Sequence, residues 1–402
     1  MLAASASAQA GITIPAGDWT LDIGGVVNAY YTNTRMTGDA TAGYSGAFMA
    51  GDNGNSKNVS NITTGLLPNY LSVSGKSRQN DLDIAFTISI NPGASTTHAG
   101  IQTGGSNDTF IGNQENRQAF LTIGDASWGS VKLGKDLGIF ASDAILNDMT
   151  LLGVGAGAGG LAGNTTTLGR IGTGFMYADW KSQVAYTSPN WNGFQFTAGV
   201  TQAFDAIDVV ANSATSAGRG GAAPAFEAKA SYAWTGDVAG KVWVSGISQK
   251  VDNLTDGTTQ FGSERARAWD LGANVNVAGF GLTGYYYDGK GIGQTVQLNG
   301  GFDVTGKRRD SKGGYVQATY TLPSATKLGV SWGRSTLEAN TADAIADGQA
   351  GKDLKDRMWT VGAYHPLTKS VNLVAEYSDV KSEVGTLEGK GKTMSLGAIL
   401  FF

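Results

Sequence analysis

The sequence predicts an all-β protein, a 16-stranded antiparallel transmembrane β-barrel. Segments of about ten residues recur to the end of the chain, and in each of them apolar and polar residues alternate with the period of a strand. The connections between these segments alternate between short and long. No stretch approaches the roughly 18–20 consecutive apolar residues of a membrane-spanning helix. Glycine accounts for 60 of the 402 residues.

The alternating segments define sixteen predicted strands, with one apolar and one more polar face each. In 81–90, for example, Leu82, Ile84 and Phe86 oppose Asp81 and Asp83. The predicted strands are 19–31, 69–79, 81–90, 115–125, 128–136, 173–187, 193–204, 225–235, 240–250, 265–277, 280–288, 312–322, 327–335, 356–365, 370–381 and 391–402.

The last strand ends the chain on an apolar face. Met394, Leu396, Ala398, Leu400 and Phe402 share one parity in "TMSLGAILFF". We expect this strand to pair with the first one, so that Phe402 closes the barrel and no edge with unpaired backbone meets hydrocarbon.

The lengths of the links predict which strand ends are joined by short turns and which by long loops. Short links such as "SPNWN" and "LPSA" carry turn chemistry. The predicted long links are 32–68, 91–114, 137–172, 205–224, 251–264, 289–311, 336–355 and 382–390. Aromatic side chains gather near the short turns, as a membrane-interface girdle requires. We assign Tyr186, Trp191, Phe194, Trp234, Tyr320 and Tyr364 to this girdle.

Composition excludes several kinds of site. The chain has no cysteine, two histidines (His98 and His365) and a net charge of −4. These numbers argue against a disulfide framework, a zinc–thiolate site and a histidine metal cluster. The mild acidity argues against a nucleic-acid partner. We expect no cofactor, no metal site and no catalytic residues.

The first ten residues, "MLAASASAQA", fit the end of an export signal, because Ala8-Gln9-Ala10 matches the A-x-A cleavage pattern. An ordinary unstructured start is the alternative. With the signal remnant at 1–10, residues 11–402 form a single barrel domain.

At this point the chain resembles the Gram-negative general porins. "NRQAFLTIGDASWGSVKLGKDLGIF" (116–140) is similar to the hairpin that leads into their inward-folded third loop. "LGRIGTGFMYADWKSQVAYTSPNWNGFQFTAGV" (168–200) is similar to the strand–turn–strand that follows, and Phe402 resembles their C-terminal aromatic residue. The resemblance implies an outer-membrane homotrimer, surrounded by lipid and lipopolysaccharide. It also implies a water-filled lumen, narrowed by loop 3 (137–172), for ions and small hydrophilic solutes.

In this family, acidic residues on the inward loop face basic residues on the wall, and the opposed charges set selectivity. We place Asp143 and Asp148 at the constriction and Asp136 at the loop entrance; the alternative is that the first two cap a short helix in "SDAILNDM". Alternation and the family's positions indicate a basic wall of Lys76, Arg78, Lys132, Arg117, Arg170 and Lys181.

Three other functions stay open. A substrate-selective channel for an organic anion or a sugar is favoured weakly by Tyr285 and Tyr287, which fall on the polar face. An outer-membrane enzyme, such as a lipase or protease barrel, lacks a recognisable catalytic geometry in the sequence. A soluble or adhesive β-protein does not explain the terminal Phe402 or the loop asymmetry. The formal G-x-G-x-x-G from Gly155 and the "GDNGN" stretch at 51–55 are interpreted as loops rather than nucleotide or Ca²⁺ sites.

Overall fold

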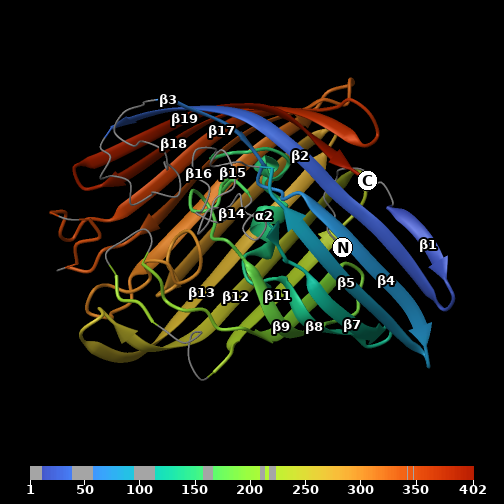
Figure 1. Cartoon of the computed structure of the whole chain (residues 1–402), viewed down its shortest axis with the longest axis horizontal. Coiled ribbons are helices and arrows are strands. Elements are labelled where there is room, and N and C mark those ends of the chain that lie inside the picture. The colour runs from blue at the N-terminus through green and yellow to red at the C-terminus, as the bar shows by residue number, and fades with distance from the viewer. Residues whose placement is uncertain are drawn as a thin grey trace, which may run out of the picture.

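In the computed structural model of the chain, antiparallel strands pair in a closed ring (Figure 1). The structure describes residues 11–38, 58–94, 114–156, 166–208, 213–216, 223–341, 343–346 and 348–402. The predicted signal remnant at 1–10, the 51–55 turn and His98 therefore lie outside the described residues. Among the described helices, none is both long and apolar enough to cross a membrane.

Nineteen strands occur in the described residues, and sixteen of them overlap the predicted strands one for one. These sixteen are β2 (Trp19–Gly38), β4 (Tyr70–Gln79), β5 (Leu82–Pro92), β7 (Ala119–Asp125), β8 (Gly129–Leu137), β9 (Trp180–Thr187), β10 (Phe194–Thr201), β11 (Ala225–Trp234), β12 (Val238–Thr255), β13 (Gln260–Val277), β14 (Phe280–Lys290), β15 (Asp310–Thr321), β16 (Lys327–Leu337), β17 (Leu354–Pro366), β18 (Val371–Val384) and β19 (Leu387–Phe401). The remaining three, β1 (Ile12–Ala16), β3 (Asn58–Thr63) and β6 (Gln114–Glu115), are short and extend the lines of β19, β4 and β7. The barrel wall is therefore sixteen strands around.

The ring closes between the last strand and the first long one, as the terminal alternation predicts. β19 pairs with β2 from Gly389↔Gly38 to Phe401↔Val26. Beyond that, Gly25 N donates to Phe402 O at 2.9 Å, and Phe402 N donates back to Gly25 O at 3.1 Å. A Cβ on Gly25 would lie 2.4 Å from Tyr70 O and 2.7 Å from the Phe402 ring. Only glycine fits at this closure.

Alternation sorts the side chains between the two faces of the wall. Met394 and Leu396 are exposed on the outer face, whereas Thr393 and Ser395, which alternate with them, are buried inside. The aromatic girdle is largely present: Trp191, Phe194 and Tyr320 are exposed near the short turns. The assignment of Tyr364 to the girdle is wrong. Its parity is that of the inward Met358 and Thr360, and its hydroxyl donates to Glu376 at 2.6 Å.

Two predicted long links are wrong, because the strands continue through most of them. β12 and β13 are joined at 256–259, and β18 and β19 at 385–386. The residues involved are polar, but a cross-strand ladder satisfies their backbone as well as a loop does, and side chains such as Lys381 and Glu388 form ion pairs across it. Strand β9 also begins at Trp180, seven residues later than predicted (180 against 173), because 173–179 belongs to the loop before it.

Two loops fold into the barrel and build its core there. The first inner loop (138–156 and 166–179) contains α2 (Ser142–Leu146) and η2 (Met149–Leu152), and Figure 1 shows α2 inside the wall. The second inner loop is 291–309, between β14 and β15. Phe140, Phe175 and Phe302 from these loops pack in one buried cluster with inward wall residues such as Trp243 and Tyr287. The apolar core of this protein therefore lies inside the barrel, between loops and wall.

If the outer face meets hydrocarbon, a charge there is costly. Val330, exposed at 51% on β16, faces outward at mid-strand. We predict that Val330→Arg destabilises the barrel by about 2–4 kcal/mol, whereas Leu367→Arg in the turn after β17 costs about 0–1 kcal/mol. Urea unfolding of the protein in lipid vesicles measures both variants. Equal losses in the two would mean that the outer face is not in hydrocarbon.

Candidate channel lining

The inner loops cover only one side of the interior. Many inward side chains of β13 to β18 are buried, and some, such as Asp270, Tyr287 and Thr360, have no exposed area. Inward side chains of β4 to β8, such as Lys76, Thr87 and Thr122, keep exposed or partly exposed surface. The accessible part of the interior therefore runs along β4, β5, β7 and β8.

The start of the first inner loop is held by a wall glutamate. Glu227 on β11 accepts from the backbone N–H groups of Ile139 and Phe140, both at 2.8 Å to Oε2. Its other oxygen accepts from Lys181 Nζ at 2.7 Å and Thr201 Oγ1 at 2.8 Å. All four contacts are buried, so the carboxylate is fully satisfied and the loop start is fixed to the wall.

A second wall glutamate holds the far part of the loop in the same way. Glu376 on β18 accepts from the N–H groups of Val154 and Gly155, both at 2.8 Å to Oε2, and from Tyr364 at 2.6 Å. A Cβ on Gly153 would lie 2.2 Å from a Glu376 carboxylate oxygen. Glycine is required there because the loop backbone lies directly against the carboxylate. Sequence reasoning gave no role to either glutamate.

Asp143, an expected constriction acid, lies on α2 in direct contact with the wall. Its carboxylate pairs with Lys229 Nζ of β11 at 2.9 Å and with Lys241 Nζ of β12. Burial raises the pKa of Asp143, but the two lysines outweigh it and hold the pKa below its ordinary value. The contribution of this carboxylate to stability is therefore present at neutral pH and lost as the pH falls through the lowered pKa. With two lysines to one acid, the group carries a net charge of +1.

Lys229 and Lys241 were not among the predicted wall bases, although Lys229 lies on the polar face of its predicted strand. Alternation identifies an inward lysine, but it does not tell which strand lies opposite the tip of the loop.

Asp148 and Arg170, the next two predicted site residues, meet within the first inner loop. Arg170 Nε lies 3.8 Å from Asp148 Oδ1, and neither side chain has exposed area. Asp148 also accepts from Thr150 N at 3.1 Å, which caps η2. The capping alternative therefore holds for Asp148, on η2 rather than on α2. Arg170 belongs to the loop and not to the wall. Its guanidinium reaches the wall and donates to Met358 O on β17 at 3.0 Å.

The other predicted wall bases differ in accessibility. Lys132 faces inward on β8, partly exposed, and forms an ion pair with Asp136. Lys181 is buried against Glu227 and also donates to Gln297 of the second inner loop at 2.6 Å. Arg117 is buried, with its guanidinium 5.8 Å from the centroid of the Trp180 ring. Of these bases, Lys132 alone reaches the accessible side of the interior with appreciable exposed area.

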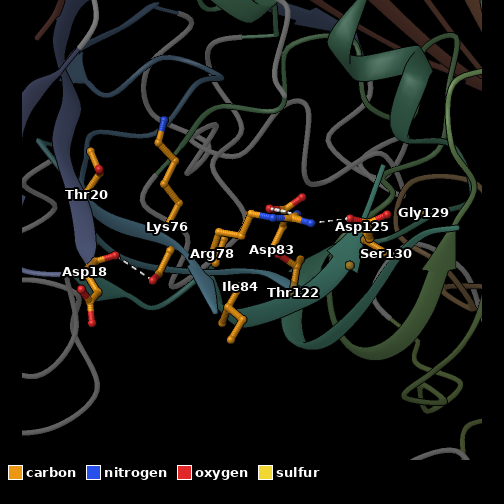
Figure 2. Close-up of a pocket in the computed structure, with 13 residues that line it drawn as sticks. Asp18, Thr20, Lys76, Arg78, Asp83, Ile84, Thr122, Asp125, Gly129 and Ser130 are labelled. Atoms are coloured by element: carbon orange, nitrogen blue, oxygen red, sulfur yellow. Dashed lines mark hydrogen bonds and ion pairs between the residues drawn. The ribbon is translucent and has the colours of Figure 1, made fainter. Parts of the chain in front are cut away.

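Lys76 and Arg78 line a cavity of about 530 Å³ at the short-turn end of the barrel. Figure 2 shows the Arg78 guanidinium between Asp83 and Asp125, at 2.8 Å and 3.0 Å, and Lys76 apart from this group. The cavity wall thus holds both charge signs on exposed side chains, as a polar vestibule does.

Tyr285 and Tyr287, the basis for a sugar slide, do point inward but are buried beneath the inner loops. Their rings pack with Tyr315 and Phe175 in the core. They therefore present no aromatic surface to a solute. His365 Nδ1 lies 2.9 Å from Thr326 Oγ1 near a short turn. Within the described ranges, no cluster of three or more acidic or histidine side chains could hold a metal ion.

The Glu227 anchor should be necessary for an ordered first inner loop. Glu227→Gln leaves the buried Lys181 without its carboxylate, a loss of about 3–5 kcal/mol, and should make single-channel currents noisier. The control is Glu388→Gln, which removes partly exposed ion pairs worth about 0–1 kcal/mol. Urea unfolding and current recordings measure both effects. A quiet, fully stable Glu227→Gln channel would mean that this contact does not hold the loop.

Comparison with known proteins supports the geometric description. A family model described as Gram-negative porin matches residues 1–385. The outer-membrane channel DcaP of Acinetobacter baumannii aligns with 14% identity and a TM-score of 0.67, over 98% of this chain and 100% of that one. An anion-selective porin from Comamonas acidovorans aligns with 14% identity and a TM-score of 0.60, over 96% and 100%.

A third structure, Salmonella typhi OmpF in complex with daunomycin, aligns with 15% identity and a TM-score of 0.58, over 96% and 100%. No curated protein matches the sequence. At these identities the solved structures show the shared fold, and the family model covers nearly the whole chain. The chain belongs to the Gram-negative porin family, as an outer-membrane β-barrel that forms a channel for passive diffusion.

Proposed function

We propose that residues 11–402 act as one barrel domain in which ions and small hydrophilic solutes cross between the first inner loop and the wall formed by β4, β5, β7 and β8. The observation that carries this proposal is the one-sided burial of the interior. Inward side chains are covered from β13 to β18 and accessible from β4 to β8. The described parts of the predicted constriction segment 137–172, residues 137–156 and 166–172, form the opposite side of this path.

The charges of the inner loop and of the wall are held in contact pairs. Asp143 touches Lys229 and Lys241 directly, so the acid and the bases do not face each other across water. Lys132–Asp136 and Arg78–Asp83 are paired in the same way. In a narrow aperture with low-dielectric walls, even such pairs produce a local field, and an unbalanced pair biases passage by charge. The group around Asp143, with its net +1, is the one we assign to ion selection.

We favour a channel over an enzyme, and a general channel over a selective one. The polar groups of the interior are engaged in holding loops: Glu227 and Glu376 each saturate their oxygens on backbone N–H groups and neighbouring side chains. The sugar slide loses its support because Tyr285 and Tyr287 are buried. The vestibule cavity beside Lys76 and Arg78 is the place where a preference for an organic anion would arise.

We also propose a homotrimer embedded in lipid and lipopolysaccharide. The outer face of β19, β2, β4 and β5 exposes mainly aliphatic side chains: Val27, Leu71, Ile88, Ile90, Met394 and Leu396. The outer face from β10 to β17 exposes both aliphatic side chains, such as Leu282 and Val316, and many aromatic ones, among them Phe226, Trp269, Phe280, Trp332 and Trp359. Aromatic rings are enriched at membrane–water interfaces, so a face with few of them suits packing against a neighbouring subunit. One similar structure, OmpT of Vibrio cholerae, is described as a trimer form; it aligns with 15% identity and a TM-score of 0.55, over 96% of this chain and 99% of that one.

Planar-bilayer recording tests the channel and its charge selection together. Conductance should fall in three equal steps. Lys229→Gln with Lys241→Gln reverses the local charge from +1 to −1 and should move the reversal potential toward cations. Asp143→Asn should move it toward anions, because the two lysines that it neutralises are partly exposed. Asp148→Asn should change it little, because Asp148 pairs with Arg170 and neither side chain has exposed area. An unchanged reversal potential in the first two variants would place selection elsewhere, and a folded wild type without conductance would refute the channel.

The aliphatic face should be needed for the trimer and not for the barrel. We predict that Val27→Asn with Ile88→Asn converts heat-modifiable trimers to folded monomers on a gel. The control is Leu282→Asn with Val316→Asn, since these side chains are equally exposed on β14 and β15. Trimers that survive the first pair, or that are lost with the control pair, would contradict this assignment of the interface.

A further inference from the structure

A row of cations crosses the outer face of the barrel near the long-loop end of β16 to β19. Arg334 on β16 lies directly opposite Arg357 on β17, and Arg357 lies opposite Lys381 on β18. Lys381 in turn lies opposite Lys390 on β19. Like charges directly opposite each other destabilise a sheet, so a row of four needs counter-charges.

The chain supplies counter-charges to the lysine half of this row. Glu388 pairs with both Lys381 and Lys390, and Glu383 pairs with Lys381 at 2.6 Å. Two lysines thus meet two glutamates, and the group is neutral. Within the described residues, no ion pair joins Arg334 or Arg357 to an acidic side chain, and both are exposed.

Ion pairs surround the two arginines. Lys312 on β15 pairs with Glu338 at 2.5 Å, and Lys355 on β17 pairs with Asp353 at 3.7 Å. These lysines each have an acidic partner, so in the part of the chain that the structure describes the two arginines are the cations of the patch without an acidic partner in an ion pair. Their charge matches a phosphate group, which guanidinium groups bind through paired N–H donors.

An apolar floor lies beside the arginines, toward the middle of the strands. Trp332 lies opposite Trp359, two residues from Arg334 and Arg357, and Val330 lies opposite Val361 in the next outward row. All four are exposed on the outer face. On the β15 side, the residue opposite Arg334 is Gly314, which leaves the guanidinium open to a ligand from that direction. A cationic end above an apolar surface fits a lipid with an anionic headgroup.

We propose that Arg334 and Arg357 bind the phosphate of a phosphorylated lipid headgroup in the outer leaflet, with its acyl chains lying over Trp332 and Trp359. This inference deepens the lipid partnership proposed above, and it rests on the outer-membrane location and not on conduction. The lysine half of the row provides the internal contrast, because the chain neutralises it without a ligand. The aromatic rings anchor the chains at the interface and the guanidiniums select the headgroup.

The test measures binding of bis-phosphorylated lipid A to the folded barrel in neutral detergent by native mass spectrometry. Arg334→Gln with Arg357→Gln should weaken binding by about tenfold or more, the loss of a charge-assisted contact. The matched control, Arg265→Gln with Arg267→Gln, removes two exposed outward arginines from β13 and should leave binding unchanged. Dephosphorylated lipid A should bind wild type no better than it binds the double variant. Excess inorganic phosphate should not displace the lipid, because it lacks the acyl chains.

Equal binding to both double variants, or undiminished binding of the dephosphorylated lipid, would overturn the proposal. Displacement by inorganic phosphate alone would also overturn it, because the site would then be a free-anion site. Conductance separates this inference from the channel proposal. The arginines face outward, so Arg334→Gln with Arg357→Gln should conduct like wild type.

Discussion

Every backbone N–H and C=O group in the wall of the barrel must be paired within the wall. A strand edge in hydrocarbon leaves polar groups that nothing can satisfy. The β19–β2 ladder, completed by the two hydrogen bonds between Gly25 and Phe402, removes that edge. Once the ring is closed, the pleat alone determines which side chains meet lipid and which face the interior, and the period-2 pattern follows from it.

A closed ring of this size encloses more space than its own inward side chains fill, and the inner loops occupy the remainder on one side. The same kind of contact attaches the first inner loop to the wall at two places. A wall carboxylate, Glu227 or Glu376, accepts two consecutive loop N–H groups, which satisfies loop backbone that would otherwise be buried without partners. The aromatic cluster around Tyr315 and Phe175 then packs loop against wall. A rigid, off-centre filling leaves the opposite wall free for water, which is what a diffusion channel requires.

The outer face is divided by chemistry rather than uniform. The exposed side chains on β19 to β5 are mainly aliphatic and suit a neighbouring subunit, whereas farther around the barrel aromatic rings join the aliphatic side chains and suit the lipid interface. Near the long-loop end, charges replace both. There the pairing registers bring like charges together, and the chain balances some of them, as at Lys381, and leaves others, as at Arg334, to an external anion. The chemistry of the outer face can differ from zone to zone because alternation places the side chains that pack inside the barrel on the other face of each strand.

The sixteen strands, the closure at Phe402 and the inward direction of Lys76, Lys132 and Lys181 could be predicted from the amino-acid sequence, because they depend only on local period and parity. What each inward residue contacts could not be predicted in this way. Asp148 and Arg170 are sealed within the loop, and Tyr285 and Tyr287 are buried beneath it. Lys229 and Lys241, not the predicted bases, hold Asp143. Parity fixes the face of a strand on which a side chain lies. The path of an inner loop across that face depends instead on contacts between residues far apart in sequence, such as Glu376 with Val154, which no local pattern encodes.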